Sequence, residues 1–130
     1  MNSEDLKRRF IVDEKTVAKD LETLVEKALE FCVVDTTGRV HLKQHELPAK
    51  VRIKLVLSAR RIASQLDASF SPELSIEEIT AATGLPSNQV RARLNEVAAD
   101  RFAEASGRGT YKANTFRIQS FLDELRSDQE

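Results

Sequence analysis

Two histidines and one cysteine are the residues of this chain whose types could bind a metal ion. His41 and His45 are four residues apart, and Cys32 precedes both. The alternating apolar pattern around His41 predicts a strand, and His45 falls in the loop after it, so the two rings do not share a helix face. We therefore expect no metal site and no cofactor, with surface histidines and a buried structural cysteine.

Three further groups contain residue types that catalysis uses. Cys32 is flanked by apolar residues and has no basic neighbour in sequence to lower its pKa. Glu77 and Glu78 are adjacent, so they point to different faces of a helix and do not form a carboxylate pair. The segment Gly107-Arg108-Gly109 lacks the Lys-Ser/Thr that follows in a phosphate-binding loop. The sequence predicts no enzyme activity.

Composition and charge exclude several further classes of protein. The chain has 130 residues, of which 32% are charged and 41% hydrophobic, which is typical of one globular domain. A net charge of −1 excludes a polycation that coats nucleic acid by charge alone, and a single cysteine excludes an intramolecular disulfide. No apolar run approaches the ~20 residues of a membrane span, and no secretory signal is recognisable. We expect a cytoplasmic protein that does not bind membranes.

Charge is unevenly distributed along the chain. Residues 48–113 carry 10 basic and 7 acidic side chains, a net charge of +3. The flanking segments 1–47 and 114–130 each have a net charge of −2. The only positive excess therefore falls on the middle of the chain.

The first half of the sequence predicts two helices and a β-hairpin. A helix capped by Asp13 is indicated by apolar residues at three- and four-residue steps: Val17, Leu21, Leu24, Val25, Ala28 and Leu29. A two-residue period over 31–43, with Gly38 at the turn, predicts a hairpin. A central helix over 48–66 is expected to face inward with Val51, Leu55, Ala59, Ile62, Ala63 and Leu66. Residues 67–74 are expected to form a connector.

The second half predicts two helices joined by a tight turn. Ser75 and Glu78 form a capping box, and Gly84 follows at a C-cap position, so the first helix is short. A second helix opens at Pro86 and Ser87. An apolar seam joins the two helices: Ile76, Ile79, Leu85, Val90 and Leu94. Two glycines around Arg108 then mark the tip of a second hairpin over 102–113.

This order of helix, short helix, turn, helix and hairpin resembles the winged helix-turn-helix superfamily of DNA-binding domains, in the layout of small archaeal or bacterial regulators. The resemblance covers residues 48–113. We expect a mainly α protein with small β-hairpins, of the α+β class. Residues 1–47 would add an N-terminal helix and hairpin and residues 114–130 a C-terminal helix, all packed as one unit.

The resemblance also implies which residues meet DNA. It places Ser87, Asn88, Arg91 and Asn95 on the outer face of a recognition helix over 86–99, with Gln89 and Arg93 as weaker candidates. Arg91 would pair with a guanine edge and Asn88 or Asn95 with an adenine, while Ser87 would contact a phosphate. At the wing, Arg108 would reach the minor groove or backbone and Lys112 a phosphate.

Two features depart from the superfamily pattern. Arg101 stands where a glycine often ends the recognition helix, and the expected interface carries few cations. Few phosphate contacts imply modest non-specific affinity and modest salt dependence.

Two functions therefore remain open. The first is sequence-specific binding of double-stranded DNA by a transcriptional regulator. The second is a winged-helix module that contacts another protein within a larger complex and does not bind DNA.

A final helix is expected after its cap Asn114, with an apolar stripe along one face: Ile118, Phe121, Leu122 and Leu125. This stripe either packs on the chain's own core or pairs the terminal helices of a homodimer.

Overall fold

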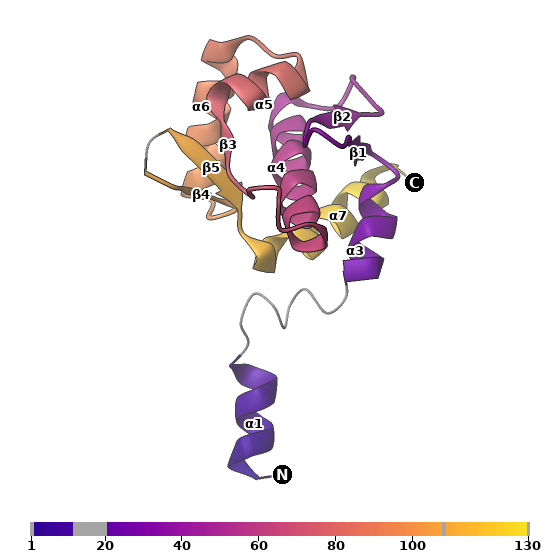
Figure 1. The fold of residues 1–130 in the computed structure, drawn as a ribbon, viewed down its shortest axis with the longest axis vertical. Helices are drawn as coiled ribbons and strands as arrows, with labels where there is room; N and C mark the ends of the chain where they lie inside the picture. The colour runs from indigo at the N-terminus through magenta and orange to yellow at the C-terminus, as the bar shows by residue number, and fades with distance from the viewer. Residues whose placement is uncertain (1, 12–20, 108, 130) are drawn as a thin grey trace.

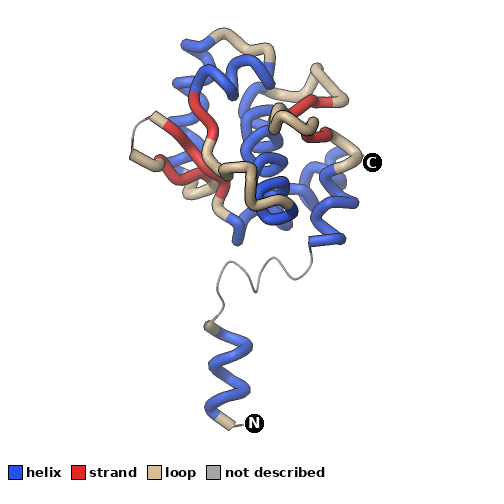
Figure 2. Tube along the Cα trace, viewed as in Figure 1, coloured by secondary structure: helices blue, strands red, loops and turns tan. Residues whose placement is uncertain are grey.

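A computed structural model describes residues 2–11, 21–107 and 109–129. Its elements in chain order are α1 (Ser3–Phe10), α3 (Leu21–Ala28), β1 (Cys32–Val34), β2 (Val40–Leu42), α4 (Ala49–Leu66), β3 (Leu74–Ser75), α5 (Ile76–Thr83), α6 (Ser87–Ala99), β4 (Ala103–Ala105), β5 (Thr110–Ala113) and α7 (Thr115–Gln129). Helices predominate and the strands form two small antiparallel sheets (Figure 2). The predicted α+β class is confirmed.

Helix α4 is at the centre of the elements from α3 to α7, which surround it (Figure 1). The predicted helix is confirmed: Pro48 is its N-cap and Leu66 its last residue. The middle turns of α4 are apolar all round because other elements pack against them on all sides. Four residues are fully buried there: Ile53, Leu55, Val56 and Leu57. The expectation that Leu66 faces inward is wrong. That side chain is 62% exposed, because it stands at the end of α4 on the rim of an open groove.

The larger sheet has the strand order β3-β5-β4. Strand β4 pairs with β5 as the predicted second hairpin, with Glu104 opposite Lys112. Strand β3 lies at the end of the segment we expected to be a connector. It has only two residues and is defined by their pairing with Tyr111 and Thr110, far along the chain, so no local pattern marks it.

The smaller sheet is the predicted first hairpin, with Cys32 opposite Leu42 and Val34 opposite Val40. Its turn needs a glycine, because Gly38 has a φ of +91° and a Cβ there would lie 3.0 Å from the Arg60 guanidinium. Arg60 extends from α4 and donates hydrogen bonds to the carbonyls of Gly38 (2.7 Å) and Ser71 (2.6 Å). This side chain therefore fastens the hairpin and the connector to α4.

Only part of the predicted N-terminal helix can be compared with the structure. Helix α3 spans Leu21–Ala28 and buries Leu24 and Ala28, whereas Leu29 is 46% exposed and not part of the inward face. The expected cap at Asp13 and the apolar Val17 lie outside the described residues. Helix α1 was not predicted, and it buries none of its residues.

Helix α7 packs on the chain's own core. Asn114 caps it as predicted, its Oδ1 accepting from the backbone N–H of Phe116 at 3.1 Å. The expected apolar stripe is buried throughout: Ile118, Phe121, Leu122 and Leu125. Of the two alternatives for this stripe, packing within the chain is therefore the one observed. One hydrophobic core includes residues from Leu24 to Leu125. No helix in the described part of the chain is long and apolar enough to cross a membrane.

Candidate nucleic-acid interface

The turn between α5 and α6 fixes how the second helix is presented. The predicted capping box at the start of α5 is present, with Ser75 Oγ accepting from Glu78 N–H and Glu78 accepting from Ser75 N–H, both at 3.1 Å. At the other end, Gly84 takes the left-handed conformation with a φ of +74°. Leu85 follows directly and is buried, and α6 then starts at Ser87 after the N-cap Pro86.

Two polar side chains hold this turn in place. Thr83 is buried, and its hydroxyl donates to the carbonyl of Ile79 at 2.8 Å and accepts from Leu85 N–H at 3.3 Å. Arg52 of α4 donates to the carbonyl of Thr83 at 3.2 Å, which satisfies a backbone acceptor at the end of α5. The direction of α6 is therefore fixed by hydrogen bonds as well as by the apolar seam.

Helix α6 has one buried and one exposed face. Val90, Leu94 and Val97 are fully buried against the core. The predicted contact residues all lie on the exposed side: Ser87, Asn88, Arg91 and Asn95. Because residues three and four apart share a helix face, Asn88, Arg91 and Asn95 form a continuous polar strip with Ser87 at its N-terminal end. We call these four residues the α6 strip.

Arg91 differs from its neighbour Arg93. No ion pair of Arg91 occurs within the described residues, and its side chain is exposed. Arg93 instead pairs with Glu96 one turn later, with 3.4 Å between Nη1 and Oε1, and its Nε is buried without a hydrogen-bond partner in the described structure. Arg91 is thus the cation of the α6 strip that is available to a ligand, whereas the charge of Arg93 is partly neutralised.

The β4–β5 hairpin lies on the same side of α4 as α6, and the β1–β2 hairpin lies on the opposite side (Figure 1). Its tip is built from Gly107 and Gly109, both with positive φ. Arg108 lies outside the described residues. The predicted phosphate contact Lys112 is half-buried, and its Nζ lies 3.8 Å from a carboxylate oxygen of Glu104 on the paired strand. Lys112 is therefore not as freely presented as expected.

Arg101 closes the junction between α6 and β4. It is the one non-glycine residue of the described chain with a positive φ, +64°. Its N–H donates to Ala98 O (3.0 Å), and the next N–H, of Phe102, donates to Val97 O (3.1 Å), which is the Schellman arrangement of a helix C-terminus. Its exposed side chain adds a cation near the end of α6. From the sequence, Arg101 was notable only because it stands where a glycine often ends the recognition helix. Its charge was not predicted to contribute to the interface.

Other cations near α6 are engaged within the chain. Lys50 Nζ lies 2.7 Å from a carboxylate oxygen of Asp100, and the hydrogen bond and charge of Lys50 lower the pKa of Asp100 from its usual value. Lys54 Nζ lies 5.2 Å from the ring centroid of Phe102 and 5.5 Å from that of Phe121. These two side chains stabilise the base of the interface rather than extending it.

The histidine and cysteine positions lie elsewhere. His41 Nε2 is 2.7 Å from Asp35 Oδ2, and the hydrogen bond from His41 is the main reason that the pKa of Asp35 lies well below its usual range. Burial raises the pKa of the Cys32 thiol to about 11, so the thiol is protonated at neutral pH. No group of three possible metal ligands occurs within the described ranges.

Comparisons with known proteins give no relative from which to transfer a function. No family model, curated protein or solved structure matches this chain.

Proposed function

We propose that residues 48–113 form a winged helix-turn-helix domain that binds double-stranded DNA, with α6 as the recognition helix and the hairpin over 102–113 as the wing. The order α4-β3-α5-α6-β4-β5 and the strand order β3-β5-β4 support this assignment. So does the tight left-handed turn at Gly84 that joins α5 to α6. In this proposal the chain is a cytoplasmic transcriptional regulator.

One observation carries the proposal. The α6 strip gathers a hydroxyl, two amides and an arginine on one exposed helix face, while the opposite face is buried. Among the described residues this arginine forms no ion pair. An exposed helix of this kind fits the major groove, where a guanidinium reads guanine and a carboxamide reads adenine. Ser87 and the first amides of α6 are suited to a backbone phosphate.

The test begins with selection of a preferred duplex from a random pool, followed by fluorescence-anisotropy titration at low salt. Arg91→Ala is expected to weaken binding of the selected duplex by about 1–3 kcal/mol, because a bidentate base contact is lost. Arg39→Ala is the matched control, since it removes the same charge from the β1–β2 turn on the other side of α4. The proposal would be contradicted if no duplex binds, or if Arg91→Ala and Arg39→Ala lose the same affinity for the selected duplex.

A second function has an observation of its own. Arg93 on α6 and Lys112 on β5 lie within ion-pair distance of Glu96 and Glu104. Such pairing lowers the positive potential that DNA binding uses and favours a module that contacts another protein. That alternative predicts a specific protein partner in a pull-down, unchanged by Arg91→Glu, together with no duplex binding.

A further inference from the structure

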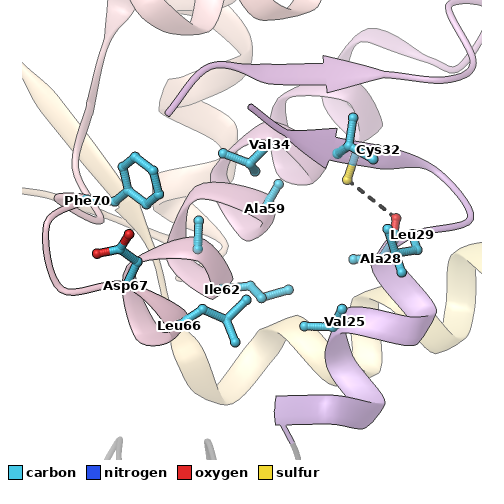
Figure 3. A pocket seen from close by; sticks show the side chains of 12 residues that line it. Val25, Ala28, Leu29, Cys32, Val34, Ala59, Ile62, Leu66, Asp67 and Phe70 are labelled. Atoms are coloured by element: carbon cyan, nitrogen blue, oxygen red, sulfur yellow. Dashed lines mark hydrogen bonds between the residues drawn. The ribbon is translucent and has the colours of Figure 1, made fainter. Parts of the chain in front are cut away.

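An apolar groove lies on the side of the molecule formed by α3, β1 and the C-terminal half of α4 (Figure 3). Its volume is about 300 Å³, and nearly all of its lining is hydrocarbon. Buried Cys32 and Ile62 lie among the lining residues, whereas Leu29, Val33 and Leu66 are 46%, 41% and 62% exposed. Large apolar side chains are thus left in water around the groove, which marks an interaction site.

Helix α1 presents a second uncovered apolar surface. Leu6 and Phe10 are one turn apart and share a face, and Ile11 follows at the C-cap. They are 53%, 89% and 72% exposed. The described residues include only seven exposed large hydrophobic side chains, and six of them belong to α1 or to the groove; the seventh is Phe116. The two surfaces therefore hold nearly all of the exposed large apolar side chains of the described chain.

The charges around the two surfaces are complementary. Glu22 and Glu26 of α3 are exposed beside the groove residues of that helix, and neither forms an ion pair in the part of the chain that the structure describes. On α1, Lys7 and Arg9 are placed by helix periodicity on the two sides of the stripe formed by Leu6 and Phe10. A basic amphipathic helix therefore fits a groove with an acidic border.

We propose that the groove binds α1 of a second copy of this chain, so that two chains exchange N-terminal helices about a two-fold axis. Within the described residues of a single chain, both surfaces are uncovered, and a helix of eight residues is marginal in water unless its apolar face is packed. The nine residues between Ile11 and Leu21 limit the separation of α1 and α3 to at most roughly 35 Å. Reciprocal exchange fills both grooves and closes the assembly as a dimer.

The first test is the mass of the full chain by light scattering and sedimentation over a range of concentrations. The wild type is expected to be dimeric. The double variant Leu6→Glu/Phe10→Glu and the groove variant Val33→Glu/Leu66→Glu should each raise the dimer dissociation constant at least about tenfold, because carboxylates enter an apolar contact. All four side chains are exposed, so circular dichroism should report an unchanged fold.

The control is Phe116→Glu, which places a glutamate on the one exposed large apolar residue of the described chain that lies outside the two surfaces. Its dimer dissociation constant should equal that of the wild type. A monomeric wild type at every concentration would overturn the proposal, including the case in which α1 covers its own groove. So would a dimer that tolerates both double variants, or one that Phe116→Glu disrupts equally.

Charge reversal tests the orientation of the docked helix. Glu22→Lys/Glu26→Lys should weaken the dimer at low salt, and adding Lys7→Glu/Arg9→Glu in the same chain should restore it. Restoration supports contact between α1 and the acidic border of the groove. A further loss on combining the two pairs would contradict that contact.

Discussion

At the scale of single residues, the interface depends on which cations remain available. Lys50, Arg93 and Lys112 each lie within ion-pair distance of an acidic residue of the same chain. Arg91 forms no ion pair with any residue that the structure describes, and its neighbours in the α6 strip are uncharged. We therefore attribute base reading to Arg91 and the two asparagines, and expect backbone contacts to contribute less than in a strongly basic domain.

The position of Lys112 was predictable from sequence, but its pairing was not. Glu104 and Lys112 become neighbours only through the register of the β4–β5 hairpin. Several registers are compatible with a tip containing two glycines, so the sequence does not reveal this contact. The exposure of Ser87, Asn88, Arg91 and Asn95, in contrast, follows from helix periodicity once Val90 and Leu94 are assigned to the core.

Asp35 gives a pH-dependent prediction at this scale. Its carboxylate accepts from His41, from the Thr37 hydroxyl and from two backbone N–H groups, which hold its pKa below the usual range. A depressed pKa in the folded state means that the stabilisation is complete above the unfolded-state pKa and is lost as pH falls through the folded-state pKa.

We therefore expect Asp35→Asn to lower the free energy of unfolding at neutral pH, and the difference from wild type to shrink progressively below about pH 4. Urea unfolding at a series of pH values measures this difference. A difference that stays constant down to the most acidic pH would show that the carboxylate charge is not responsible.

At the scale of elements, local signals predicted most of the fold. The capping box and Gly84 delimit α5, and the two-residue period with Gly38 predicts the first hairpin, because caps and turns are encoded within a few residues. Strand β3 was not predicted, because it is defined by its pairing with β5, which is distant in sequence. Helix α1 was not predicted, since it has few apolar residues and none of them is buried in the described part of the chain.

The C-terminus of α6 gives a prediction at this scale. Arg101 holds a left-handed conformation that glycine adopts without steric cost, and its backbone accepts from Asn114 Nδ2 at 3.1 Å. Arg101→Gly should stabilise the protein by about 1 kcal/mol, because the strain at Cβ is removed while the Schellman hydrogen bonds remain. Urea denaturation measures the change.

The matched control for that change is Gly84→Ala, which introduces a Cβ at the left-handed end of α5. Beyond its chain neighbours, no atom lies within 4 Å of the added Cβ, so only the backbone cost applies. It should destabilise the protein by about 1 kcal/mol. If Arg101→Gly also destabilises the protein, the side chain of Arg101 contributes more than its backbone conformation costs.

At the scale of the whole molecule, the net charge of +3 on residues 48–113 is larger than the positive charge that remains available to a ligand. Many of its cations are engaged within the chain: Lys50, Lys54, Arg60, Arg93 and Lys112. The sequence places the excess on residues 48–113 but does not show this pairing. The proposed interface is therefore small and selective, and a dimer would double it.

Amide chemical-shift mapping of the full chain, titrated with the selected duplex at low salt, tests the central claim most directly. The proposed interface predicts the largest shifts between Ser87 and Asn95 and in the hairpin over 102–113. The β1–β2 hairpin, on the other side of α4, should remain unchanged. An absence of shifts, or shifts confined to β1–β2 and α3, would contradict DNA binding through α6.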